Sequence, residues 1–323
     1  MSDKIAQQKE RGAGPEASAL ATGGSEGRLE TVSSRGLKQK KELRRVLGGA
    51  PMRLFLAVVT IIWTLPTIGL LVSSFRTRGA INRSGWWTVF ANPFAADFTL
   101  ANYEQVIFAD RLGTAFLNSF LVTLPSTVIP ITIAAFGAYA IAWMRFPGRT
   151  VLFVAIVGLL VVPLQTALIP ILRLYTRAQL NGTFLGIWLA HTGFGLPLAT
   201  YILYGYVSGI PKSIIESAHA DGATPWLMFT RLVLPLSIPA VASFAIFQFL
   251  WVWNDLLVAL VFLGTSADKA VLTARLAELV GSRGQDWHVL TAGAFLTMVM
   301  PLIVFFSLQR YFVRGMMAGS VKG

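Results

Sequence analysis

The sequence contains no cysteine and few charged residues. Only 13% of its 323 residues are Asp, Glu, Lys or Arg, whereas soluble globular domains usually carry about 25%. The absence of cysteine excludes disulfides, zinc–thiolate sites and thiol nucleophiles. The three histidines, His191, His219 and His288, are too far apart in the sequence to suggest a metal site.

Motifs for nucleotide binding and catalysis are also absent from the sequence. It contains no G-x-x-x-x-G-K-[ST] phosphate loop, no H-E-x-x-H pair and no arrangement that suggests a Ser–His–Asp triad. We therefore expect no enzyme activity and no cofactor or metal on this chain. The net charge of +12 does not indicate nucleic-acid binding, because membrane proteins gather Lys and Arg in cytoplasmic loops beside anionic lipid.

Long apolar runs are what the sequence has in abundance. Hydrophobic residues make up 54% of the chain, and a helix needs about 20 of them to cross a bilayer. The expected fold class is an all-α integral membrane protein with six transmembrane helices. Pro125 and Pro130 are expected to kink the second helix. The six runs cover residues 54–74, 112–144, 151–172, 184–207, 240–263 and 288–312.

Two domains are expected from this pattern. Residues 1–52 form a basic, disordered cytoplasmic head without a signal peptide, and residues 53–323 form the membrane domain. Residues 75–111, with several aromatics, are expected to be an extracytoplasmic loop. Lys and Arg gather in the head, the 145–149 turn and the tail, so the positive-inside rule places both termini in the cytoplasm together with the segment 210–239.

The segment 210–239 is a polar island between two apolar runs, and its spacing predicts two helices. Ser213 and Glu216 have the spacing of a capping box, which predicts a helix over about 214–220. Gly222 supplies the positive φ that ends this helix. Thr224 and Pro225 predict the N-cap and first residue of a second helix, which Leu234-Pro235 is expected to end.

The same segment resembles the EAA motif of ABC importer permeases. The resemblance lies in Glu216-Ser217-Ala218, Asp221-Gly222-Ala223, Phe229 and Leu234-Pro235, with Ser217 where the family usually has Ala. It implies that residues near 213–223 form a coupling helix that docks on a separate ATPase subunit. Glu216 would then meet a basic residue of the ATPase. The alternative is an ordinary cytoplasmic helical hairpin in which Glu216 serves only its cap.

The run Trp251-Val252-Trp253-Asn254-Asp255 carries the one acidic residue expected inside the bilayer. An unpaired carboxylate there costs a few kcal/mol unless it faces protein or water. One interpretation is a polar translocation path, in which Trp251 and Trp253 stack on sugar rings while Asn254 and Asp255 bind hydroxyls. The other is an interhelical hydrogen bond that fixes packing. Gln165 in the third span has the same two interpretations.

Three further segments resemble carbohydrate permeases of the maltose type: the Trp-Asn-Asp run, Asn102-Tyr103 before the second span, and the terminal segment. In that family the tail can reach the ATPase dimer, which would involve Gly319, Ser320, Val321, Lys322 and Gly323. The resemblance implies a bacterial inner-membrane importer with a second homologous permease, two ATPase subunits that hold ATP and magnesium, and an extracytoplasmic substrate-binding protein. Residues 273–287 resemble the α-glucoside permeases.

The sequence also leaves other functions open. Within the family, the solute could be a polyol, a glycerol phosphate or another small solute, although Asp255 would repel phosphate if it lines the path. A proton-coupled secondary transporter using Asp255 would need paired carboxylates or His, and inverted repeats; one acidic residue in the spans and no evident repeat count against it. An integral-membrane enzyme would need reactive groups clustered at one membrane face, and the sequence shows no such cluster.

Overall fold

The computed structural model describes residues 49–93, 97–282 and 286–318. The chain divides into two units, Met1–Ile68 and Gly69–Gly323. Apart from Gly49, the described part of the first unit belongs to a single helix, α2, which continues to Ser74. Most of the predicted head and the whole tail segment 319–323 lie outside the described residues, so both remain predictions.

Helices dominate the described residues, as the sequence predicts; the β-structure there is one isolated bridge between Arg76 and Phe98. The helices are α2 (Ala50–Ser74), α3 (Arg78–Arg83), α4 (Thr88–Ala91), α5 (Ala101–Glu104), α6 (Leu112–Trp143), α7 (Arg149–Gly158), α8 (Leu164–Arg177), α9 (Phe184–Val207), α10 (Lys212–Ala220), α11 (Pro225–Met228), α12 (Leu234–Trp253), α13 (Leu257–Phe262), α14 (Leu272–Ser282) and α15 (Trp287–Ala318).

Four of these helical segments are long and apolar enough to cross a membrane: Pro51–Ser74, Leu112–Trp143, Pro225–Trp253 and Trp287–Ser307. A fifth span is possible if α7 and α8 count as one. Helix α9 has the length of a span, 24 residues, but its glycines, threonines and His191 make it less apolar. The six predicted runs correspond to the four apolar segments, the pair α7 and α8, and α9. The count of six spans stays a prediction.

Two predicted spans are interrupted, which corrects the expectation of continuous helices. In the third, α7 ends in a 3₁₀ turn at Leu159–Val161, and α8 begins after Pro163 at an angle of 106°. Proline cannot donate a backbone hydrogen bond and disfavours a helical residue before it. In the fifth, the helix ends at Trp253, and Asn254 and Asp255 lie in a break before α13.

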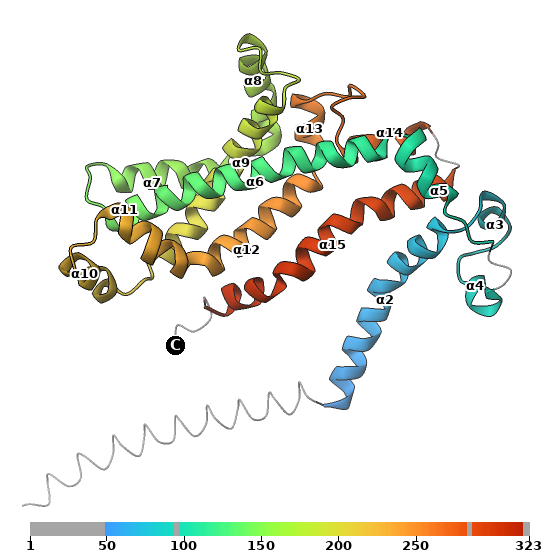
Figure 1. Cartoon of the computed structure of the whole chain (residues 1–323), viewed down its shortest axis with the longest axis horizontal. Coiled ribbons are helices and arrows are strands. Elements are labelled where there is room, and N and C mark those ends of the chain that lie inside the picture. Colours follow the sequence, from blue (N-terminus) through green and yellow to red (C-terminus); the bar gives the residue numbers. More distant parts are fainter. Residues whose placement is uncertain (1–48, 94–96, 283–285, 319–323) are drawn as a thin grey trace, which may run out of the picture. The chain divides into compact units, whose positions relative to one another are not determined.

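Within the second unit, α6, α9, α12 and α15 form the helical bundle (Figure 1). Helices α10 and α11 lie at one end of this bundle, and α13 and α14 lie at the other. Buried apolar residues of α6, α9 and α12 continue to Ile215 of α10 and to Met228 and Phe229. The apolar core therefore joins the polar island to the bundle helices.

Three prolines inside helices lie where a side chain of another helix forms a hydrogen bond. A proline leaves the carbonyl four residues earlier without its helical donor, and a buried carbonyl without a donor is costly. Three such carbonyls in the bundle accept a side-chain donor from another helix. Trp188 Nε1 donates to Leu121 O, four residues before Pro125, at 3.0 Å. Gln248 Nε2 donates to Ser126 O, four residues before Pro130, at 3.1 Å.

The third such contact joins α12 to α15. Trp253 Nε1 donates to Thr297 O, four residues before Pro301, at 3.1 Å. A related contact lies where the chain leaves α9: Trp143 Nε1 donates to Val207 O, four residues before Pro211, at 3.1 Å. The first three contacts satisfy carbonyls that a proline would otherwise leave unpaired, whereas Val207 O also accepts from Ile210 N at 3.2 Å.

Replacing Trp253 with Phe should destabilise the membrane domain. The variant keeps an aromatic ring in this buried site but leaves Thr297 O without its donor, which costs about 1–3 kcal/mol. We expect the midpoint of thermal unfolding in detergent to fall by several degrees. Trp251→Phe is the matched control, because no described residue accepts a hydrogen bond from the Trp251 indole. Equal midpoints for the two variants would contradict this role of the indole.

Candidate coupling helix and translocation path

The first helix of the polar island ends as the glycine predicts. Gly222 has a φ of +77°, and the turn is a Schellman motif. In this motif Ala223 N donates to Ala218 O at 3.0 Å, and Gly222 N donates to His219 O at 3.0 Å. Ala218, Gly222 and Ala223 of the EAA-like segment therefore build the end of α10.

The capping-box prediction is wrong. Helix α10 begins at Lys212, with Pro211 at the N-cap and no side-chain capping bond, so Ser213 lies inside the first turn. Glu216 instead pairs with Lys212 across one turn at 2.9 Å, and both side chains are exposed. The proline supplies the extended backbone before the helix, which leaves the Glu216 carboxylate at the surface.

The second helix starts as predicted but does not stop at Leu234-Pro235. Thr224 Oγ1 accepts from Leu227 N at 3.3 Å, and Pro225 is the first helical residue. The helix then continues through a π-helical turn at Phe229–Val233 into α12. In a regular α-helix the ring of Pro235 would clash with the carbonyl of Arg231, four residues earlier. The wider π-helical turn contains Arg231 and makes room for the ring. Helices α11 and α12 are therefore one continuous connection from the island into the bundle.

Residues of the EAA-like segment divide between an exposed surface and a buried anchor. Glu216, Ser217, Asp221 and Gly222 are exposed, and Ala218 and Ala223 are half-buried. Phe229 is buried and stacks on Phe136 with ring centroids 4.5 Å apart. On the opposite side of α10, Ile215 is buried in the bundle core. The exposed residues can meet a partner, and the anchor fixes α10 to the bundle.

The residues predicted for a translocation path do not share one cavity, although Trp253 and Asp255 both border a cavity of about 10 Å³ beside His191. Trp253 is buried between α6 and α15, with Phe116 and Phe249 against its ring. Asn254 donates to Leu250 O at 2.8 Å and is exposed at the end of α12. Gln165 is exposed on α8. Of the predicted set, Trp251 lines an apolar cavity at the bend between α7 and α8.

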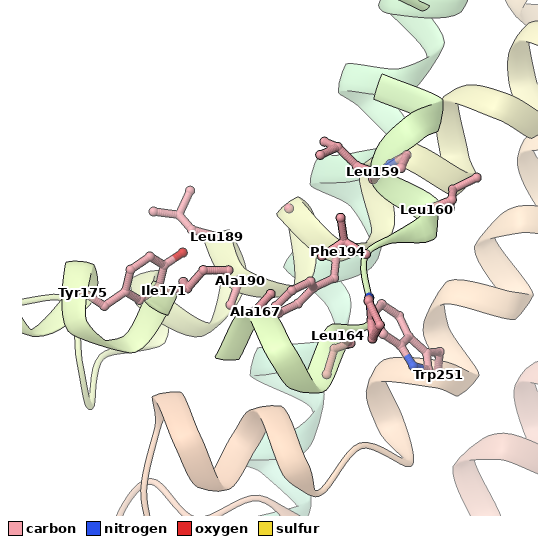
Figure 2. A pocket seen from close by; sticks show the side chains of 14 residues that line it. Leu159, Leu160, Leu164, Ala167, Ile171, Tyr175, Leu189, Ala190, Phe194 and Trp251 are labelled. Carbon is pink, nitrogen blue, oxygen red and sulfur yellow. The ribbon is translucent and has the colours of Figure 1, made fainter. Parts of the chain in front are cut away.

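This bend cavity follows the chain from the end of α7 along α8 (Figure 2). Its volume is about 530 Å³, and its walls are mostly apolar. Trp251 and Leu164 lie at one end of the labelled lining, and Tyr175 lies at the other. The phenol of Tyr175 and the indole of Trp251 are its polar side-chain groups among the described lining residues. The aromatic rings of Trp251, Tyr175 and Phe194 line this cavity and can stack on a sugar ring.

Asp255 lies in the break between α12 and α13, and its side chain caps α13. Its carboxylate accepts from Val258 N at 3.2 Å and from Ala259 N at 2.9 Å, so it caps the first turn of α13. Its backbone carbonyl accepts from Thr273 Oγ1 at 2.6 Å. The carboxylate also faces Nε2 of His191, a fully buried residue of α9, at 3.8 Å. These contacts with α13, Thr273 and His191 fit the interpretation of Asp255 as a packing residue.

Several residues that tie the bundle together carry no evident signal in the sequence. Gln248 and Trp188 bind the proline-freed carbonyls, and His191 faces Asp255 beside a cavity of about 10 Å³. Gly195 is needed beside Gln248, because a Cβ there would lie 2.6 Å from Gln248 Nε2. The positions of the prolines are the sequence signal that could have located the acceptors, though not their donors.

Comparison with known proteins identifies the family. Residues 134–318 match the model of the family described as binding-protein-dependent transport system inner membrane component. The chain belongs to this family. The match runs from the second half of α6 to the end of α15 and includes both the island and Asp255. The chain is therefore a multi-pass permease subunit of an ABC importer and not an enzyme.

Two relatives resemble the permease over most of its length. It is 59% identical over 273 residues to the osmoprotective compounds uptake permease protein of Synechocystis sp., covering 84% of this chain and 92% of the relative. It is 58% identical over 258 residues to the alpha-glucoside transport system permease protein of Rhizobium meliloti, covering 78% and 67%.

A solved structure confirms the fold of the permease. A chain of a bacterial ABC transporter involved in the import of the acidic polysaccharide alginate superposes with a TM-score of 0.68 at 22% identity. The superposition covers 83% of this chain and 97% of that chain. The expected importer permease fold is thereby confirmed.

Asp255 variants can separate capping from substrate contact. Asp255→Leu removes both acceptors from the first turn of α13, so we expect a loss of about 1–3 kcal/mol of stability and at least tenfold slower uptake. Asp255→Asn keeps one acceptor of similar shape and should retain most uptake with an unchanged KM. A raised KM in an Asn variant of normal thermal stability would instead indicate that the carboxylate contacts the solute.

Proposed function

We propose that the permease translocates sugars, with α-glucosides as the first candidate class. The observation that carries this proposal is the 58% identity to a permease named for α-glucoside transport. The similar identity to a permease named for osmoprotective compounds makes such compounds the second candidate. Both relatives match the segment that includes the bend cavity and its aromatic residues.

Sugar passage is compatible with the chemistry of the bend cavity. A sugar ring has apolar faces, which Trp251 and Phe194 can cover, and hydroxyls, which the Tyr175 phenol can bind. No Lys, Arg, Asp or Glu is among the residues that line this cavity in the described structure. A charged solute such as a glycerol phosphate would find no counter-ion there, and this favours a neutral solute.

The proposed assembly contains two homologous permease subunits, two ATPase subunits and an extracytoplasmic substrate-binding protein. Both termini and α10 face the cytoplasm in this arrangement. ATP and magnesium are held by the ATPase subunits. When the ATPase dimer closes, the exposed face of α10, with Glu216, Ser217 and Asp221, is carried with it. The buried Ile215 and Phe229 transmit this movement to α6, α9 and α12.

Proteoliposomes containing the full importer, reconstituted with its binding protein, test the proposed substrate. ATP hydrolysis and solute uptake would be measured with maltose, trehalose, sucrose, glycine betaine and glycerol 3-phosphate. We expect stimulation by one or more glucosides and none by glycerol 3-phosphate. Stimulation confined to glycine betaine would favour a non-sugar osmoprotectant, and stimulation by glycerol 3-phosphate alone would overturn the assignment of a neutral solute.

A further inference from the structure

A second cavity, of about 590 Å³, lies at the end of the bundle that carries the polar island. Its walls come from the end of α6, the turn into α7, helix α10 and helix α11. The apolar lining residues are Tyr139, Ala142, Trp143, Met144, Ile215, Pro225 and Met228, and the ionisable ones are Arg145, Arg149, Lys212, Glu216 and His219.

The charges around this second cavity are unbalanced. Three cations, Arg145, Arg149 and Lys212, face one carboxylate, Glu216, and that carboxylate already pairs with Lys212 at 2.9 Å. Arg145 and Arg149 have no acidic partner among the described residues. Arg149 Nη1 donates to Met144 O at 3.2 Å, which holds the guanidinium across the turn and beside the cavity.

The location of the second cavity brings an apolar surface and these cations together at a membrane boundary. The α6 helix ends at Trp143, so Arg145 and Arg149 follow a spanning helix directly. Tryptophan and tyrosine favour the membrane–water interface. Trp143 is held in place by its bond to Val207 O, and Tyr139 is buried in the bundle core one turn earlier.

We propose that this second cavity binds the headgroup of an anionic phospholipid. Its phosphate lies against Arg145 and Arg149, whose guanidinium groups can bind phosphate oxygens in pairs. The glycerol and the start of the acyl chains lie over Trp143 and Met228. Basic pockets between membrane helices on the cytoplasmic side recognise such headgroups. The choice of the cytoplasmic leaflet rests on the orientation in the proposed function.

Lipid bound there would have a consequence for coupling. Lys212, Ile215 and Glu216 of α10 form one wall of the cavity, and the α6–α7 turn forms the other. An occupant in contact with both would fix the distance between α10 and the end of α6. We therefore expect ATP hydrolysis to be better coupled to uptake in membranes that contain phosphatidylglycerol than in pure phosphatidylcholine.

Native mass spectrometry of the purified importer complex tests the site directly by counting retained phosphatidylglycerol. The variant Arg145→Gln/Arg149→Gln should retain one lipid fewer per permease, and its apparent Kd for added phosphatidylglycerol should rise at least tenfold. Arg231→Gln is the control, since Arg231 is an exposed cation of the polar island that does not line the cavity. Phosphatidylcholine should not be retained by any form.

A charge-preserving variant and a soluble competitor distinguish lipid binding from misfolding, phosphate binding and protein binding. Arg145→Lys/Arg149→Lys keeps both charges and should recover part of the lipid binding, which a merely misfolded variant would not. If glycerol 1-phosphate displaces the lipid at comparable concentration, the site binds soluble phosphates and the lipid assignment fails. If the Gln variant keeps its lipids but loses its ATPase subunits, the arginines bind protein, which also overturns the proposal. Lipid counts need no transported solute, so a wrong substrate assignment would leave this result unaffected.

Discussion

Replacing Gly222 with Val is expected to abolish ATP-driven uptake while leaving membrane insertion intact. The residue has a φ of +77°, which a β-branched residue adopts only under strain of about 1–3 kcal/mol. The Schellman turn that ends α10 would rearrange, and Asp221 and Ala223 would move with it. Because nothing lies within 4 Å of a Cβ at this position, the effect comes from the backbone conformation and not from a clash with the bundle.

Two further substitutions separate the effect of backbone strain from the effect of an added charge. Asn tolerates positive φ better than other non-glycine residues, so Gly222→Asn should retain substantial uptake. Gly222→Asp has nearly the same shape but adds a negative charge to the exposed face, and we expect it to lose uptake and ATPase binding. Uptake is measured in cells, with permease in the membrane fraction quantified by immunoblot. Normal uptake by the Val and Asp variants would contradict the role of this turn in coupling.

The second large effect is expected at Gln248, which joins α12 to α6 and α9. Gln248→Glu would place a carboxylate in a fully buried site against the carbonyl of Ser126, which now accepts from the amide. Its two recorded neighbours, Ser126 O and Gly195, carry no charge that could pair with a carboxylate. A buried charge without a partner costs about 3–5 kcal/mol, so we expect little folded permease at 37 °C.

The same change at an exposed position provides the control. Gln179 lies in the turn after α8 and is exposed, so Gln179→Glu adds an equal charge where water can solvate it. Folded yield is measured by size-exclusion chromatography of detergent-solubilised protein. If the Gln248 and Gln179 variants give equal yields, the buried amide is not needed to join the helices.

The sequence predicts local structure in the island well where one residue determines it. The positive φ of Gly222 and the N-cap at Thr224 are both confirmed. The capping box at Ser213 is wrong because Pro211 starts the helix earlier, so that the expected cap residue lies in the first turn. The stop at Pro235 is wrong because a π-helical turn accommodates the proline, and sequence spacing does not reveal such a turn.

The bundle interior shows what a single sequence cannot supply. Pro125, Pro130 and Pro301 can be read from the chain, but their carbonyl partners Trp188, Gln248 and Trp253 become visible only once the helices are packed. One interpretation of the sequence has Trp251, Trp253, Asn254 and Asp255 line a path together, but the helix ends at Trp253 and these side chains do not share one cavity. Trp251 lines the bend cavity, whereas Asp255 caps the next helix.

ATP-driven uptake by purified components tests the central claim most directly. The importer containing this permease would be reconstituted in proteoliposomes with ATP inside, binding protein and a stimulating solute outside, and a protonophore to remove any proton gradient. The account predicts solute accumulation that requires ATP, persists with the protonophore and is lost in Gly222→Val. Accumulation driven by a proton gradient without ATP, and abolished in Asp255→Asn, would contradict the coupling-helix account and make Asp255 the centre of the mechanism.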